Sequence, residues 1–404
     1  MRRLDMWKRM AAMAALVSAL AGCSTVKGWF AGKNAEAKKA TEPAELVDFE
    51  PTVRPSRLWS VDLGDGERRV GTRQVPAIAD GRVYAAAGEN ELFALDLHTG
   101  KQVWRHRVEY DKKTDKGGPM RLAGSPGVGE GLVAVGSLGG DVLVLDAATG
   151  AERWRARVSS EVIAPPAIAM GLVFVRSNDG RISAFDAATG ERRWFRDHEL
   201  PSLTVRGNAP LTIGPGVLFS GNDDGTVTAM AMNDGRVLWE LPVGLPEGRS
   251  ELERMADVDG APVLEDTTLY ASSYKNRTLA IDGPSGRPMW QSEHGGAGGI
   301  GVSASYLVVA NASGTVYALD KNSGAAMWSQ DALARRSLTG PAVHGDYAVV
   351  GDFEGYLHWL RLEDGALAAR ARVGRKAIKG QPQVADGILV VQNIRGDLAA
   401  FRLD

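Results

Sequence analysis

The chain has 404 residues, with 47 Lys and Arg against 49 Asp and Glu, and its formal net charge is −2. This balance lacks the basic excess of a nucleic-acid-binding protein, so nucleic acid is not expected as a partner. The single cysteine excludes a disulfide within the chain.

Residues 1–22 have the features of a secretory signal peptide. A basic start precedes an apolar run of 12 residues, Met10 to Ala21, which is too short to span a bilayer. The run leads into Leu20-Ala21-Gly22-Cys23, which resembles the bacterial lipobox. That resemblance implies cleavage before Cys23 and a lipid on its side chain. An incidental cysteine behind an ordinary signal is the alternative.

The residues around the expected cleavage site also bear on location and charge. Ser24 follows the cysteine, in place of the Asp that in lipoproteins commonly signals inner-membrane retention. The resemblance therefore implies the periplasmic face of the outer membrane, with the lipid as the only membrane contact. The signal carries four basic residues and one acidic residue, so its removal would change the net charge from −2 to −5.

Residues 23–55 are expected to form a lipid-anchored flexible tether. The segment is rich in Ala, Lys and Glu and ends in a stretch that contains Pro51 and Pro55. Such a composition does not bury enough apolar surface to fold alone. About 30 residues of flexible chain span on the order of 30 Å.

The rest of the chain, residues 56–404, is organised by one repeated motif, which reads Ala94-Leu95-Asp96 and Thr99-Gly100 ahead of Trp104 in its first copy. A period of 38–51 residues indicates stacked supersecondary units. The seven copies end at Gly100, Gly150, Gly190, Gly235, Gly286, Gly324 and Gly365, and the last has Ala369 in place of the tryptophan.

Each period holds four short β-type runs separated by turn residues, which predicts an all-β fold of four-stranded antiparallel blades. In the sixth period the runs are 300–304, 306–310, 315–319 and 325–330. The motif Asp and Thr suit turn formation, Gly suits a positive φ, and the tryptophan suits the space between adjacent blades. Because the motif carboxylates recur in five blades, we interpret them as turn residues and not as catalytic groups.

The ends of the chain predict how the ring closes. Ala399 to Arg402 match the beginning of an eighth copy, and the missing tryptophan strand is found at Ser56 to Leu63, around Trp59. The sequence therefore predicts an eight-bladed β-propeller, closed by an N-terminal strand in the last blade.

Function is expected where the repeat is broken, in the connectors between blades. By the four-strand pattern all connectors leave the same face, and three are long: 109–121, 199–207 and 243–258. The second contains Leu203, Val205 and Arg206, and the acidic residues Asp257 and Asp259 belong to the third and its end. An apolar segment with Arg beside an acidic segment is typical of a protein-binding patch. The alternative is that Leu203 and Val205 fold under the blade rim.

No pattern in the sequence points to a metal, a cofactor or a nucleophile. The six histidines lack HExxH spacing, and the ring has no cysteine. The glycine run at 295–299 precedes a strand and lacks the Gly-Lys-Ser/Thr ending of a phosphate loop. We expect neither a cofactor nor a catalytic site.

The motif is similar to that of quinoprotein-type repeats, and the chain as a whole resembles the BamB family of outer-membrane protein assembly lipoproteins. The lipobox, tether and repeats agree in order, as do three stretches outside the motif: 201–207, 257–262 and 351–359. The resemblance implies a non-enzymatic scaffold in the complex that folds and inserts β-barrel proteins. It also implies docking on the POTRA domains of BamA through Leu203, Val205 and Arg206, with Asp257 and Asp259 nearby. Val205 stands where the family usually has leucine.

Other subunits of that complex are implied partners, and unfolded outer-membrane proteins are candidates. Two other functions stay open. The first is a pyrroloquinoline-quinone-dependent dehydrogenase, a group that usually has a longer chain, a disulfide between adjacent cysteines and a calcium site. The second is a periplasmic adaptor for a different envelope partner.

Overall fold

The structure is a computed structural model that describes residues 41–64, 73–87, 90–109, 120–122, 124–204 and 209–404. Residues Leu46–Asp404 form one compact unit, separate from Met1–Glu45. Among the described residues, no helix has the length and apolar character needed to cross a membrane.

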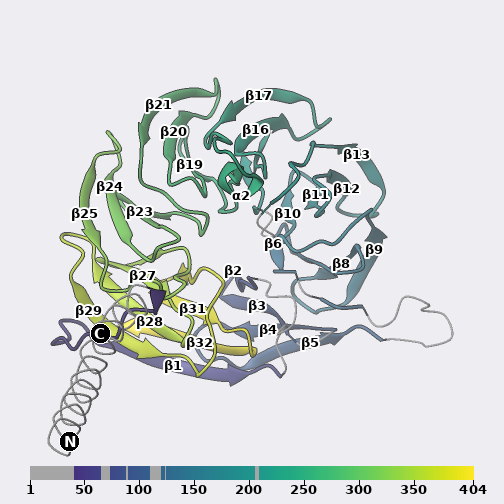
Figure 1. Cartoon of the computed structure of the whole chain (residues 1–404). Helices are drawn as coiled ribbons and strands as arrows, with labels where there is room; N and C mark the ends of the chain where they lie inside the picture. The colour runs from purple at the N-terminus through teal and green to yellow at the C-terminus, as the bar shows by residue number, and fades with distance from the viewer. Residues whose placement is uncertain (1–40, 65–72, 88–89, 110–119, 123, 205–208) are drawn as a thin grey trace, which may run out of the picture. The chain divides into compact units, whose positions relative to one another are not determined.

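Eight four-stranded antiparallel sheets are arranged as the blades of a ring (Figure 1), so the predicted eight-bladed propeller is confirmed. The innermost strands of adjacent blades contact one another around the centre. From the innermost to the outermost strand, the first four blades are β2 (Ala77–Ala79), β3 (Arg82–Ala87), β4 (Glu91–Asp96) and β5 (Gln102–Arg107); β6 (Gly127–Gly129), β7 (Leu132–Gly136), β8 (Asp141–Asp146) and β9 (Glu152–Arg157); β10 (Ala167–Ala169), β11 (Leu172–Arg176), β12 (Ile182–Asp186) and β13 (Arg192–Arg196); and β14 (Thr212–Gly214), β15 (Val217–Gly221), β16 (Thr226–Ala231) and β17 (Val237–Pro242).

The last four blades follow the same order, and the eighth takes its outermost strand from the N-terminal side of the chain. They are β18 (Val263–Glu265), β19 (Thr268–Ser272), β20 (Thr278–Asp282) and β21 (Arg287–Ser292); β22 (Gly301–Val302), β23 (Tyr306–Ala310), β24 (Val316–Asp320) and β25 (Ala326–Gln330); β26 (Ala342–His344), β27 (Tyr347–Gly351), β28 (Tyr356–Arg361) and β29 (Leu367–Arg372); and β30 (Gln383–Ala385), β31 (Ile388–Gln392), β32 (Asp397–Leu403) and β1 (Pro55–Asp62). One short helix, α2 (Glu251–Arg254), lies between blades four and five.

The motif tryptophan of each blade packs on the motif glycine of the next. Gly190 has φ +74°, and a Cβ there would lie 2.7 Å from Cδ2 of Trp154, so no other residue fits without a shift. The indole N–H groups donate to backbone carbonyls of the following blade at 2.7–3.0 Å: Trp59 to Leu97, Trp104 to Ala147, Trp154 to Ala187, Trp194 to Met232, Trp239 to Gly283, Trp290 to Lys321 and Trp328 to Leu362.

The recurring motif carboxylates form turns, as predicted. In the second blade, Oδ1 of Asp146 accepts from the backbone N–H of Thr149 at 2.9 Å and from its hydroxyl at 2.8 Å. Asp146 also accepts from Arg153 at 2.6 Å. These hydrogen bonds lower the pKa of Asp146 to about 2, and the bond from Arg153 has the largest effect. A carboxylate used in this way is occupied by its own turn.

The joint between blades seven and eight is built differently. The outermost strand of blade eight, β1, comes from the N-terminal side of the chain, so no motif turn connects it to β32 and offers a glycine to blade seven. Instead Trp359 packs edge-on against Phe401, with ring centroids 5.9 Å apart, and donates to Nδ1 of His344 at 3.3 Å. Ala369 at the motif position is buried in the same cluster.

Strand β1 closes the ring by pairing with β32, as the sequence predicts. The register runs from Pro55 opposite Leu403 to Asp62 opposite Asp397. Trp59 is buried and belongs to the cluster shared by blades eight and one. The N-terminal strand therefore supplies both the edge of blade eight and the tryptophan that blade one requires.

The residues just before β1 also belong to the ring. Thr52 donates its backbone N–H to the carbonyl of Ala368 at 2.9 Å, Val53 packs on the cluster of blades seven and eight, and Arg370 donates to the carbonyl of Val47 at 3.0 Å. Residues 46–55, which the sequence analysis assigned to the tether, therefore belong to the compact unit.

Two deletions test this account of the closure. Removal of residues 24–45 should leave the melting temperature unchanged, because the compact unit begins at Leu46. Removal of residues 24–63 should lower it strongly, since loss of a large buried aromatic alone costs about 3–5 kcal/mol. Thermal unfolding followed by circular dichroism compares the two, and equal melting temperatures would contradict closure through Trp59.

Candidate functional site

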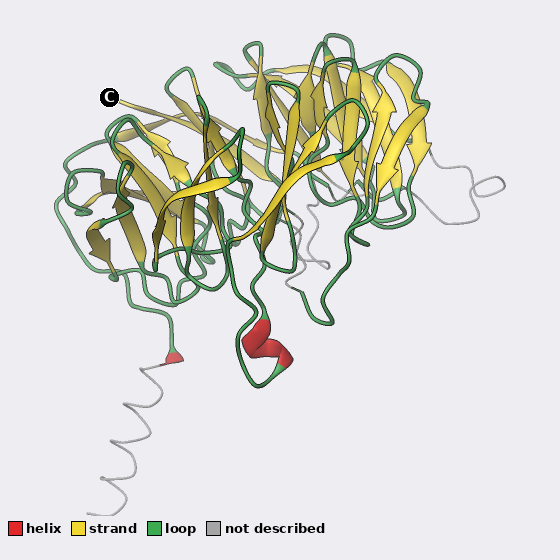
Figure 2. Ribbon diagram, turned by 90° about the horizontal axis from the view of Figure 1, so that it is seen from above, coloured by secondary structure: helices red, strands yellow, loops and turns green. Residues whose placement is uncertain are grey.

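The connectors between blades all leave one face of the ring, which we call the connector face. Each blade has four antiparallel strands, so the outermost strand ends on the side of the ring where the innermost strand began. The innermost strand of the next blade begins on that same side. Figure 2 shows α2 projecting from this side of the ring. Most of the long 109–121 connector lies outside the described residues. The two connectors on either side of blade four carry the predicted partner-binding residues.

The connector from blade three to blade four presents apolar side chains to solvent. Leu203 is 43% exposed, and Leu200 is also exposed. At its start, His198 contacts Oδ2 of Asp224 at 3.0 Å, and this hydrogen bond raises the pKa of His198 although burial opposes it. The expected surface position of Leu203 is thus observed. Val205 and Arg206 lie outside the described residues.

The acidic pair on the next connector is not on the surface. Asp257 is 0% and Asp259 4% exposed, and Val258 between them packs in the core of blades four and five. Because side chains alternate in extended chain, burying Val258 turns both aspartates to the opposite side. The predicted patch of Arg beside surface carboxylates is therefore wrong for this pair.

The two aspartates converge on a third carboxylate that sequence reasoning missed. Oxygen atoms of Asp223, Asp257 and Asp259 all lie within 4.8 Å of one another. Arg176, at the end of β11 and 3% exposed, donates to Asp223 at 3.0 Å and to the carbonyl of Gly221. We call these four residues the buried acidic cluster. Oxygen ligands at this spacing could share a cation, but one of the three already pairs with a guanidinium.

Asp259 is buried, and neither of its carboxylate oxygens has a hydrogen-bond partner among the described residues. Burial raises the pKa of Asp259 to about 7, with the charges of Asp257 and Asp223 adding to the rise and that of Arg73 opposing it. The side chain is therefore largely neutral at mildly acidic pH.

The connector from blade four to blade five forms a projection. Its tip is α2, where Ser250 and Glu253 make a capping box and Leu252 is 65% exposed. Lys275 of blade five donates to the carbonyls of Glu247 and Glu253 and so ties α2 and the segment before it to blade five. The tip thus adds an exposed apolar side chain to the connector face.

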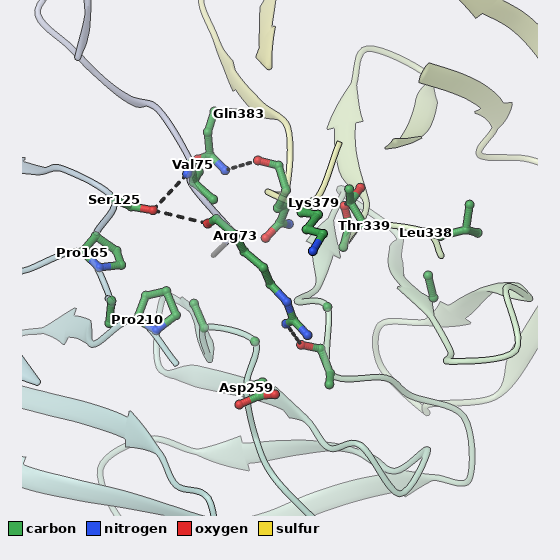
Figure 3. Close-up of a pocket in the computed structure, with 18 of the residues that line it drawn as sticks. Arg73, Val75, Ser125, Pro165, Pro210, Asp259, Leu338, Thr339, Lys379 and Gln383 are labelled. Atoms are coloured by element: carbon green, nitrogen blue, oxygen red, sulfur yellow. Dashed lines mark hydrogen bonds between the residues drawn. The ribbon is translucent and has the colours of Figure 1, made fainter. Parts of the chain in front are cut away.

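A cavity of about 620 Å³ lies where the connectors enter the innermost strands (Figure 3). Arg73, Lys379 and Asp259 contribute its charged side chains. Arg73 donates to the carbonyl of Ala297 at 3.2 Å, and Ser125 accepts from the backbone of Val75 at 2.9 Å. These bonds link segments that are distant in sequence, so the polar lining serves at least partly to hold the blades together.

The stretch 351–359 singled out in the sequence lies in blade seven and is largely buried, except for the turn at Phe353 and Glu354. Asp352 and His358 are both fully buried, and Oδ2 of Asp352 accepts from Arg336 at 2.9 Å and contacts His358 at 3.0 Å. Burial opposes ionisation of Asp352, but the hydrogen bond and charge of His358 and the bond from Arg336 leave its pKa lowered. This network stabilises a blade and is remote from solvent.

The comparisons with known proteins decide the family. A family model described as outer membrane protein assembly factor BamB matches residues 52–117, 111–330 and 312–404. This chain belongs to the BamB family.

Relatives named outer membrane protein assembly factor BamB match along nearly the whole chain. The one from Xanthomonas campestris is 64% identical over 403 residues, covering 100% of this chain and 99% of its own. That from Pseudomonas aeruginosa is 43% identical, covering 98% and 99%, and that from Escherichia coli is 35% identical, covering 93% and 94%. The BamB-family resemblance seen in the sequence is confirmed.

Solved structures agree on the fold. BamB from Moraxella catarrhalis superimposes with a TM-score of 0.77 at 25% identity, covering 86% of this chain and 100% of that one. A quinohemoprotein alcohol dehydrogenase from Comamonas testosteroni gives a TM-score of 0.67 at 15% identity, covering 86% and 76%. At such low identity, the dehydrogenase shares only the propeller with this BamB-family chain.

The buried acidic cluster predicts a pH-dependent stability. A carboxyl whose pKa is raised on folding binds its proton more tightly in the folded state, so stability is greatest below the unfolded pKa near 4 and falls as pH rises to about 7. Between pH 5 and pH 8 the free energy of unfolding should fall by up to about 3 kcal/mol from this group. Asp259→Asn should remove that component.

Urea unfolding at both pH values measures the difference. Asp234→Asn, in an exposed turn of blade four, is the matched control and should keep the wild-type pH dependence. An Asp259→Asn variant with the same pH dependence as the wild type would show that Asp259 is ionised throughout.

Proposed function

We propose that the chain is a non-enzymatic scaffold lipoprotein of the outer-membrane β-barrel assembly complex, which docks through its connector face on the periplasmic POTRA domains of BamA. The observation that carries the proposal is the full-length match to assembly factors of the BamB family. The exposed apolar side chains on the two connectors that flank blade four support the choice of face.

The predicted site residues take different parts in this proposal. Leu203 is exposed and can contact a partner directly, together with Val205 and Arg206. Apolar side chains beside an arginine are a frequent composition of binding hot spots. Asp257 and Asp259 are buried, so they do not contact a partner directly, and their backbone holds the end of the second connector: Val258 donates to the carbonyl of Asn222, and Asp257 accepts from Tyr274.

A rigid ring suits a scaffold because it fixes the relative positions of its connectors. The tryptophan contacts between blades leave little freedom for one blade to move against the next. The projection that carries α2 is held to blade five by the hydrogen bonds of Lys275. A docking surface whose segments are held before binding loses less conformational entropy on association.

The dehydrogenase alternative has fold similarity alone in its favour. The relatives that match the whole chain are named as assembly factors. The polar groups that line the central cavity include several that bond to neighbouring backbone. We therefore take assembly as the function and propose no reaction.

Substitutions in the first connector test the docking site. Leu203→Asp and Arg206→Glu should each weaken binding of the isolated POTRA segment of BamA by tenfold or more, about 1.4 kcal/mol or above, because each removes a hot-spot contact. Both should keep the wild-type melting temperature, since Leu203 is exposed. Surface plasmon resonance measures the affinity and differential scanning calorimetry the stability.

Met170→Asp is the control, because Met170 is exposed in the turn between β10 and β11, on the face opposite the connectors. It should bind the POTRA segment as the wild type does. Full binding by both connector variants would refute the site, and loss of folding would place the connector in the core.

The lipid anchor has its own test. The full chain should incorporate radioactive palmitate and fractionate with the outer membrane, because the lipobox-like tetrad ends at Cys23. Cys23→Ser should lose the label and leave the membrane fraction, while the fold is unchanged. Equal labelling of the variant and the wild type would show that Cys23 is not the modified residue.

A further inference from the structure

The residue before each motif tryptophan lies on the outer wall of its blade, and its chemistry differs around the ring. In blades two and three it is an arginine, Arg153 or Arg193, which pairs with the motif aspartate of its own blade at 2.6 and 2.8 Å. In blades one, four, five, six and eight it is an exposed apolar residue: Val103, Leu238, Met289, Met327 and Leu58.

The outermost strands also differ in how many charged residues they carry. Strands β5, β9 and β13 together contain eight arginines and one glutamate. Charged side chains on an edge strand discourage pairing with another chain. Strand β25 of blade six contains neither a charged residue nor a proline, and its Met327 is 55% exposed. It is the least protected of the outer edges in blades one to six.

Strand β21 of blade five makes a useful contrast. It carries Met289 at the same position, but its first two residues are Arg287 and Pro288. A proline in an outer strand lacks the N–H that would otherwise face outward. A chain that tried to pair with β21 would lose a hydrogen bond there, whereas no proline interrupts β25. Both strands have a β-bulge at the residue before the tryptophan, so the bulge does not distinguish the two edges.

Blade seven shows what can cover such an edge. Its outer strand β29 is overlaid by the chain's own residues 46–54, where Thr52 bonds to Ala368 and Val53 packs on the core. Phe49 lies 5.1 Å from the guanidinium of Arg370. Ala368, which occupies the position of Met327, is 1% exposed. A segment with apolar side chains therefore fits the outer edge of a blade in this ring and bonds to its backbone at Ala368, although it does not pair with β29 as a strand.

We propose that strand β25 binds an extended apolar segment of a non-native polypeptide by adding it as a fifth strand of blade six. Backbone hydrogen bonds to β25 provide affinity without a fixed sequence, and Met327 contacts alternate apolar side chains of the added strand. This inference rests on the proposed assembly function, which brings unfolded barrel strands to the protein. The site lies on the outer wall, apart from the connector face.

The test uses the full-length chain in lipid nanodiscs and a fluorescent ten-residue peptide of alternating Val and Thr. Fluorescence anisotropy should show saturable binding that Met327→Glu and Met327→Lys each weaken by tenfold or more, because either charge would be covered by the peptide. Met289→Glu is the matched control and should bind like the wild type. The same peptide with its backbone amides N-methylated along both edges of the strand should not bind, because it lacks the N–H groups that pair with β25.

The outcomes separate this inference from the docking proposal. Met327→Glu should still bind the POTRA segment, and Leu203→Asp should still bind the peptide. Equal peptide affinity for the wild type and both Met327 variants, or full binding of the N-methylated peptide, would overturn strand addition at β25. A wild-type dimer that Met327→Glu dissociates, seen by analytical ultracentrifugation, would overturn it in favour of a second copy on this edge.

Discussion

The ring depends on one interaction that is repeated between blades: an indole that packs on the next blade's motif glycine and donates to a nearby backbone carbonyl. The contact joins two sheets that share no backbone pairing, and it leaves no space for a Cβ at the glycine. A large aromatic surface is buried while its polar N–H is satisfied, which removes the usual cost of burying an indole. The contact is present wherever the next blade has a motif glycine. Blade eight has no motif glycine, and blade seven has Ala369 in place of the tryptophan.

This regularity explains why so much of the fold could be predicted from the sequence. Glycine, tryptophan and turn-forming aspartate each have one physical use at their place in the motif, so spacing alone predicts blade number, strand order and the closing role of Trp59. The 46–54 segment was harder, because its contacts with blade seven depend on single residues such as Val53 and Thr52 that follow no period. Composition alone made that segment look like tether.

The buried acidic cluster, in contrast, could not be predicted from the sequence. The alternation of side chains around Val258 indicates that Asp257 and Asp259 point to the same side of the chain. It does not indicate whether that side faces solvent or the protein interior. The answer depends on Arg176 and Asp223, which lie in different blades and carry no motif. A local signal for burial was present in the flanking core valine, yet charged residues are so rarely buried that a surface position was the natural expectation.

Because the tryptophan contact between blades repeats around the ring, much of the variation in chemistry lies in the connectors and the outer edges, beside a few interior networks such as that of Asp352 and His358. The connectors can change length without disturbing the tryptophan contacts, since they begin after the outermost strand has paired. The outer strands can change charge because only every second side chain faces the neighbouring blade. Arginines on β9 and β13 and methionine on β25 are therefore equally compatible with the ring. The fold permits either choice, so the uncharged edge at blade six is a feature that folding itself does not require.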